Sequence, residues 1–203
     1  MNNIYLKGLL TNIKPSHVIE DVEYNKADLV VKRQDGKEDV LNLRFKKYSL
    51  PYKEDHEIEL VGNVRSYSKK LGDKNKIDIY VFTYFDRPEP KDVEDGINNR
   101  VTIDGRICKI DTMRKTQAGK RNIHFILANN LCLKDTDKKL NSYIPCVAWG
   151  KLAKEISEMS VNDKVTLKGE LHSREYKKKI SEDEFEIRVA HEFVINNIER
   201  VEE

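Results

Sequence analysis

The sequence predicts an all-β protein of two successive barrels, each built from about five strands, with one short helix. Three observations support this fold class: short segments in which apolar and polar residues alternate, an internal repeat of those segments, and a single stretch with helical periodicity. The chain has 203 residues, which suits two domains of about 100 residues each.

Alternation with a period of two identifies the strands. In residues 99–107, Val101, Ile103 and Ile107 share one face with a glycine, while polar residues occupy the other face. Residues 164–171 show the same pattern, and Gly169 takes an inward position there. An inward glycine in a strand predicts a bulge or a tight bend, as at the corner of a barrel.

The strand pattern occurs twice along the chain. Glycine holds the same place in both copies of the first two matching segments, and the order of the segments is the same in both halves, which predicts an internal duplication. The matching segments are 4–8 with 101–105, 58–66 with 165–173, and 78–81 with 186–189.

The repeat predicts a boundary in the middle of the chain. Residues 88–98 are charged, contain two prolines and a glycine, and lack apolar periodicity, as expected for an exposed linker. We therefore expect a divergent N-terminal domain at 1–87 and a C-terminal domain at 99–203.

One helix is predicted. Leu152, Ile156 and Met159 form a single apolar stripe within residues 151–159. The equivalent stretch of the first half is interrupted by Pro51, so we expect its helix to be reduced or absent. About five strands with a helix between the third and fourth make an OB-fold, and the prediction is two tandem OB-fold barrels.

Composition bounds the function. The net charge of +2 is close to neutral; residues 1–98 hold 17 basic and 18 acidic residues, a net of −1, which leaves +3 for residues 99–203. No apolar stretch approaches the ~20 residues of a membrane span, and the N-terminus lacks a secretory pattern. Three cysteines without a CxxC motif predict buried thiols in a reducing cytoplasm.

Catalytic motifs are missing from the sequence. It contains no GxxxxGK[ST], GxGxxG or HExxH pattern, and its five histidines have no ligand spacing. We therefore expect no enzymatic activity, no metal and no cofactor.

The second half resembles the bacterial single-stranded DNA-binding protein family. The resemblance is carried by the opening strand at 99–106, by 143–153, which resembles the family's third strand running into its helix, and by 165–176, which resembles its fourth strand. It implies non-catalytic, largely sequence-independent binding of single-stranded DNA in replication, recombination and repair. A phage, plasmid or accessory replication system is the expected setting.

The resemblance also bears on assembly and partners. Family members with one barrel per chain usually work as tetramers of four barrels, so a chain with two barrels is expected to form a homodimer; a monomer is the alternative. Other replication proteins are further expected partners. No association with a membrane is expected.

Parity indicates which side chains can stack on bases. Ile144, Cys146 and Ala148 share one face of their strand, which places Tyr143 and Trp149 on the other. Leu171 is predicted to point inward, which places Arg174 and Tyr176 outward. Stacking contributes ~1–3 kcal/mol per base, and lysine or arginine contacts the phosphates.

In the first half, Phe45 is the expected counterpart of Trp149, although it shares parity with Leu41 and Leu43, so that burial is the alternative. Tyr67 follows Arg65 in the outward phase. Because the basic excess and the family-like aromatics lie in residues 99–203, we expect that part to bind more strongly than residues 1–90. The predicted nucleic-acid contacts are Trp149, Tyr176, Tyr143, Arg106, Arg174, Lys151, Lys177, Arg121, Tyr67, Arg65, Phe45 and Lys69.

Two other functions fit the same pattern. One is a protein–protein module of a primosome-like replication complex, whose aromatics serve an interface; the other is an RNA-binding OB protein. A steep, linear loss of log K with log salt would favour nucleic acid over a protein partner.

Overall fold

The computed structural model describes all residues except 72–73, 86–94, 133–138, 182–183 and 202–203. The N-terminal barrel contains β1 (Asn2–Ile19), β2 (Val22–Lys32), β3 (Glu38–Lys46), β4 (His56–Leu71) and β5 (Lys74–Thr83). The C-terminal barrel contains β6 (Asn99–Ile110), β7 (Arg114–Lys115), β8 (Arg121–Cys132), β9 (Lys139–Trp149), α1 (Gly150–Ser157), β10 (Lys164–Lys179) and β11 (Phe185–Arg200).

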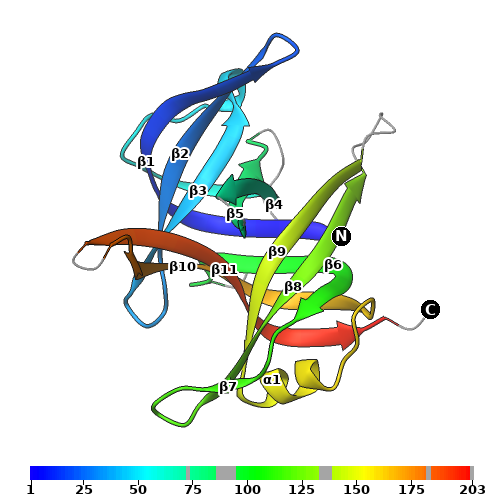
Figure 1. The fold of residues 1–203 in the computed structure, drawn as a ribbon. Coiled ribbons are helices and arrows are strands. Elements are labelled where there is room, and N and C mark those ends of the chain that lie inside the picture. Colours follow the sequence, from blue (N-terminus) through cyan, green and yellow to red (C-terminus); the bar gives the residue numbers. More distant parts are fainter. Residues whose placement is uncertain (72–73, 86–94, 133–138, 182–183, 202–203) are drawn as a thin grey trace.

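Both barrels close in the same way (Figure 1). Their strands pair antiparallel except at closure, where β3 pairs with β5 and β9 pairs with β11 in parallel. The closing pairs are Leu43 with Val81 in the first barrel and Cys146 with Phe193 in the second. The predicted fold class, two tandem OB-folds with one short helix, is confirmed.

Helix α1 follows β9 directly. Ala153 and Ile156 are buried against the barrel, and Met159 is buried just past the end of the helix. The helix is thus two residues shorter at this end than the apolar stripe predicted. A single 3-10 turn, Lys47–Ser49, takes the equivalent place before Pro51 in the first barrel, so the predicted reduction is confirmed.

The two barrels are joined edge to edge by their first strands. β1 pairs antiparallel with β6, and the register includes Asn2 with Ile103 and Leu6 with Asn99. In the repeat, residues 4–8 match residues 101–105, so each residue of β1 corresponds to the residue 97 positions later in β6. By this correspondence the pair of Asn2 with Ile103 is equivalent to the pair of Asn99 with Leu6. The barrels are therefore related by a pseudo-two-fold axis that passes between Ile4 and Val101, and all strands belong to one continuous sheet.

The register tests the repeat. Gly8 lies opposite Ile58, and Gly105 lies opposite Val165, so the first two predicted matches are confirmed. The third is wrong, because Val81 corresponds to Phe193 and not to Val189. The β10–β11 hairpin is longer than β4–β5, and an even shift along a strand preserves the alternation that the sequence displays.

Gly169 shows why glycine recurs at the strand bends. A Cβ atom placed there would lie 2.1 Å from the carbonyl oxygen of Val194, and the same test at Gly8, Gly62 and Gly105 gives 2.6 Å or less to a facing carbonyl oxygen. These strands approach too closely for a side chain, as predicted for barrel corners.

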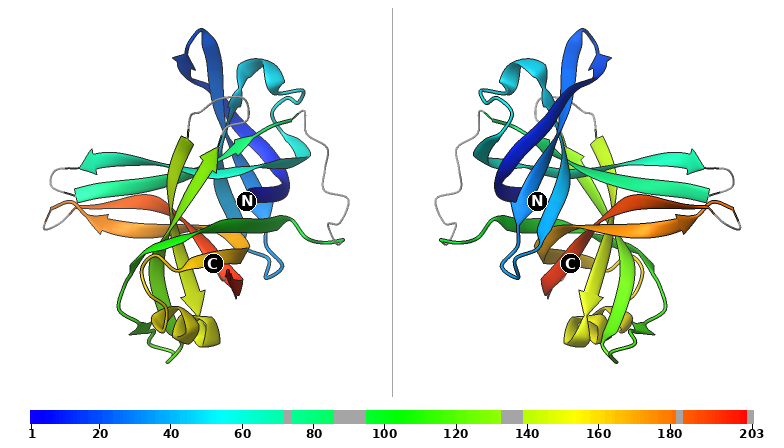
Figure 2. Two further views of the ribbon diagram at one scale, coloured as in Figure 1. Left: turned by 90° about the vertical axis from the view of Figure 1, so that its right-hand side faces the viewer. Right: turned by 90° about the vertical axis from the view of Figure 1, so that its left-hand side faces the viewer.

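The long hairpins β4–β5 and β10–β11 project side by side from the same side of the molecule (Figure 2). Residues 88–94 of the predicted linker lie outside the described residues. The described end of the linker is attached to the first barrel, because Asn98 accepts a hydrogen bond from Lys7 N and donates one to Lys32 O.

Cys146 and Cys108 differ in their exposure to solvent. Cys146 is buried, and burial raises the pKa of its thiol, whereas Cys108 is exposed, contrary to expectation.

Within the described part of the chain, no helix has both the length and the apolar character needed to cross a membrane.

Candidate nucleic-acid interface

Strand β9 presents two aromatic side chains to solvent. Ile144, Cys146 and Ala148 are buried in the core, while Tyr143 is 46% exposed and Trp149 is 42% exposed. The six residue steps from Tyr143 to Trp149 span about 20 Å of extended strand. The predicted parity is confirmed, so both rings stand where a base can reach them.

Basic residues surround Trp149. Trp149 lies opposite Asn122 on β8, and Asn122 lies opposite Arg114 on β7, so the three side chains share the outer surface. Arg121 on β8 is also exposed, but it alternates with Asn122 and so lies in the opposite phase to this row, while Lys151 is exposed in the first turn of α1. An exposed indole flanked by cations suits a base and its phosphates.

Strand β10 supplies the second part of this surface. Arg174 is exposed and Tyr176 is half-buried, both opposite in phase to the buried Leu171, as predicted. Arg174 Nε lies 3.5 Å from Glu192 Oε1, and Glu192 Oε2 lies 4.0 Å from His124 Nδ1. We call the outer surface formed by Tyr143, Trp149, His124, Arg174, Tyr176 and Glu192 the C-terminal face.

Two predicted residues point elsewhere. Arg106 donates a hydrogen bond to Asn162 O at 2.9 Å and lines a hollow with Val161 and Lys164, away from Trp149. Lys177 lies opposite Ile187 on the inner side of the hairpin, in the opposite phase to Tyr176. Arg106 lies opposite Ala128, which lies opposite Tyr143, so its backbone borders the C-terminal face while its guanidinium is bonded at Asn162.

The N-terminal barrel has a cluster of rings and cations on the equivalent surface. The Arg44 guanidinium lies 4.7 Å from the ring centre of Tyr67 and 4.4 Å from that of Tyr80, and the two rings are 6.0 Å apart. These three side chains line a hollow together with Lys14 and Lys26. The two lysines, the arginine and the two half-buried tyrosine rings thus border one recess.

A second cluster adjoins the first. The Arg65 guanidinium lies 3.9 Å from the Phe82 ring centre and donates a hydrogen bond to the Tyr84 hydroxyl at 2.7 Å. The Tyr24 ring stacks on His17 at 4.8 Å. Burial, and then the nearby Arg44 charge, lower the pKa of His17, which favours the neutral ring. We call the surface of Tyr24, Arg44, Arg65, Tyr67, Tyr80 and Phe82 the N-terminal face.

Phe45 is wrong as a stacking residue. Its side chain is 0% exposed and belongs to the core. The pairs Tyr24–Lys46 and Asn122–Trp149 occupy equivalent positions in the two barrels, so Lys46 is the counterpart of Trp149. The Lys69 side chain lies outside the described residues, and its backbone pairs with Lys76.

Sequence reasoning missed Tyr80 and Phe82 as members of the N-terminal face. A signal was present, because both alternate with Ile79 and Val81, which are buried. The same parity that selected Trp149 would have placed both in the outward phase, where Tyr80 is half-buried and Phe82 is covered by its neighbours and only 8% exposed. Tyr24 and His17 could not be found in this way, because their pairing depends on the irregular register between β1 and β2.

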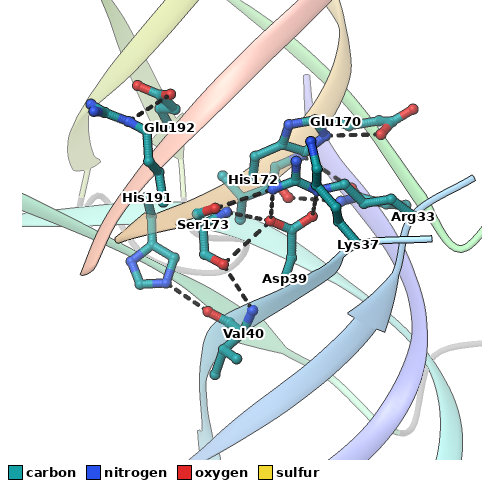
Figure 3. A network of polar contacts seen from close by, with 12 residues as sticks. Arg33, Lys37, Asp39, Val40, Glu170, His172, Ser173, His191 and Glu192 are labelled. Carbon is teal, nitrogen blue, oxygen red and sulfur yellow. Dashed lines mark hydrogen bonds and ion pairs between the residues drawn. The ribbon is translucent and has the colours of Figure 1, made fainter. Parts of the chain in front are cut away.

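The two barrels also meet through side chains, as Figure 3 shows. Asp39 on β3 is fully buried and accepts hydrogen bonds from Arg33 Nε at 2.6 Å and from the backbone N–H of Ser173 on β10 at 2.5 Å. His191 Nε2 lies 2.8 Å from Val40 O, so this nitrogen carries the proton.

His191 predicts a pH dependence of stability. Burial lowers its pKa, partly offset by the Val40 carbonyl and by Asp78, Asp39 and Asp28. The unfolded chain therefore binds the proton more readily, and stability falls as the pH drops below about 6.5. We expect urea unfolding to show a smaller loss between pH 7.5 and 5.5 for His191→Gln than for the wild type. Equal losses would contradict this role.

No group of three or more His, Cys, Asp or Glu side chains suited to a metal ion occurs within the described ranges.

Comparisons with known proteins agree with this fold. The model of the Single-strand binding protein family matches residues 98–201. The single-stranded DNA binding protein of Thermus aquaticus has a similar structure: the wild type gives a TM-score of 0.67 at 18% identity, covering 100% of this chain and 94% of the other. A deletion mutant of that protein gives 0.69 at 17% identity, covering 100% and 95%. No sequence among curated proteins matches the chain.

Proposed function

Since this chain belongs to the single-strand binding protein family, we propose that it binds single-stranded DNA without catalysis and largely without sequence preference. The observation that carries the proposal is Trp149, an exposed indole in one row with Arg114 and two residues before the exposed Lys151 on an OB-fold surface. An aromatic ring can stack on any base, and a cation can bind any phosphate. Binding by this combination therefore depends little on the nucleotide sequence.

The C-terminal face is proposed to stack bases on Trp149, Tyr143 and Tyr176, while Arg174 and Lys151 contact phosphates. Arg174 shares its charge with Glu192, so a phosphate has to compete with a carboxylate there. Arg106 and Lys177 are not part of this surface, and we leave them out of the proposed site.

The N-terminal face is proposed as the second binding surface of the chain. Arg44 and Arg65 already lie against rings, and Tyr67 borders the recess with Tyr80. Cations held over rings offer flat surfaces on which a base can stack. This surface lacks a counterpart of Glu192, because Tyr80 occupies that position.

The finer biological roles follow from this activity. We propose that the protein covers single strands exposed during replication, recombination and repair, and that replication proteins are partners. We also propose a homodimer, which brings four barrels together. Light scattering tests the dimer, since it would give twice the chain mass of 23.7 kDa.

The test of binding uses the single tryptophan of the chain. Titration with oligo-dT is expected to quench its fluorescence, and log K is expected to fall linearly with log salt by about 0.7 per phosphate contacted. Oligo-rU is the parallel ligand and reports the preference between DNA and RNA. Absence of quenching and of salt-dependent binding would overturn the proposal.

A further inference from the structure

The junction between the barrels contains a buried ion pair that the repeat does not require. Asp39 is 0% exposed and Arg33 is 20% exposed, and the Arg33 guanidinium binds both carboxylate oxygens. The carboxylate also accepts the N–H of Ser173 at 2.5 Å and its hydroxyl at 3.3 Å. A charged group of the N-terminal barrel is thus satisfied in part by the C-terminal barrel.

Ser173 is held by the N-terminal barrel at every polar atom. Beyond the two bonds to Asp39, its hydroxyl oxygen accepts the N–H of Val40 at 2.9 Å, and its carbonyl accepts a hydrogen bond from Arg33 Nη2 at 3.1 Å. His191, which lies opposite Ser173 on β11, adds its bond to Val40 O. Figure 3 shows these groups converging on the base of the β10–β11 hairpin.

The pseudo-two-fold axis supplies an internal comparison. Ser142 takes the place of Asp39 in the other barrel, four residues before the closing pair, and Ser66 takes the place of Ser173. Among the described residues, the equivalent junction shows one hydrogen bond of this kind, from Tyr143 N to Ser66 Oγ at 2.7 Å. The hydrogen bond from a backbone N–H to a serine hydroxyl therefore occurs at both junctions, whereas the buried carboxylate of Asp39 occurs at one of them.

The tied segments lead directly to the proposed binding residues. Ser173 immediately precedes Arg174, and Tyr176 follows two residues later on β10. Val40 shares the outer phase of β3 with Arg44, about 13 Å further along the strand. Fixing Ser173 against Val40 therefore fixes part of the C-terminal face relative to part of the N-terminal face.

We propose that Arg33 and Asp39 are positioning residues for nucleic acid. They hold the β10–β11 hairpin against β3, so that a single strand of DNA can bind the N-terminal face and the C-terminal face at the same time. The inference rests on the proposed function. When two sites are joined in a suitable geometry, the second contact becomes intramolecular and raises the affinity of a ligand that reaches both. A ligand confined to one barrel gains nothing from the junction.

The test compares two oligo-dT lengths in the full chain. About 8 nucleotides fit one barrel, and about 35 exceed the reach of either barrel alone. The variant is Arg33→Met/Asp39→Ser, which removes both charges and installs the serine of the other junction. The control is Lys37→Met/Asp35→Ser, which removes an exposed ion pair of the same turn and leaves the net charge equally unchanged.

We expect the variant to bind the short oligonucleotide within about twofold of the wild type and the long one at least about tenfold more weakly. The salt slope for the long ligand is also expected to become shallower, because fewer phosphates are contacted. The control is expected to match the wild type for both lengths.

Equal losses for the two lengths, or no loss for the long one, would overturn the positioning role. If the wild type binds neither oligonucleotide, the proposed function itself fails. Should the double variant not fold, Ser173→Ala provides the same readout, because it removes only the hydroxyl and keeps the backbone contacts. That variant is then expected to weaken the long ligand selectively.

Discussion

Arg33→Met is expected to destabilise the protein by about 3–5 kcal/mol, toward the lower end of that range because Arg33 is 20% exposed and partly screened. The substitution keeps a long side chain but removes the charge that compensates a fully buried carboxylate. Without Arg33, Asp39 retains hydrogen bonds from Ser173 but has no counter-ion within 4 Å in the described part of the chain. Urea unfolding at neutral pH measures the loss.

Two further variants separate charge from packing. Lys37→Met removes an exposed cation of the same turn and is expected to change stability by less than about 0.5 kcal/mol. Arg33→Met/Asp39→Ser leaves no buried charge unpaired and is expected to recover most of the loss. If the double variant is as unstable as Arg33→Met, the defect is one of packing and the buried charge is not its cause.

Trp149→Ala is expected to weaken binding of single-stranded DNA by ~1–3 kcal/mol, about a 5- to 150-fold rise in Kd. The indole offers the largest exposed ring on the C-terminal face and has basic neighbours. Because its side chain is 42% exposed, thermal unfolding is expected to change little. Anisotropy of a labelled oligo-dT is the measurement, since the variant has no tryptophan left to quench.

Trp149→Phe is the matched variant for this prediction. It retains an aromatic surface and is expected to keep most of the affinity, whereas a role in packing alone would not distinguish binding between Phe and Ala. Tyr176→Ala is expected to act in the same direction and range. Early melting of Trp149→Ala together with normal binding by the folded protein would show that the ring supports the barrel.

The candidate site could be predicted as far as parity extends. Alternation placed Tyr143, Trp149, Arg174 and Tyr176 on the outside, because successive side chains of a strand point to opposite faces. Alternation also grouped Phe45 with the buried Leu41 and Leu43, but it did not prevent the alignment of Phe45 with Trp149, which is one residue out of phase and so exchanges the inner and outer faces. It also could not show that Arg106 turns toward Asn162.

The sequence by itself determined the two barrels, their short strands, the glycines at the bends and the single helix, because each depends on local periodicity or backbone space. The tertiary structure decided the rest. Period two fixes a face but leaves the register free by even steps, which is why the third repeat match failed. The junction unites Asp39 and Ser173 across 134 positions, and the aromatic clusters join β2, β3, β4 and β5. Such partners are chosen by how the strands pair and close, and no local pattern records that choice.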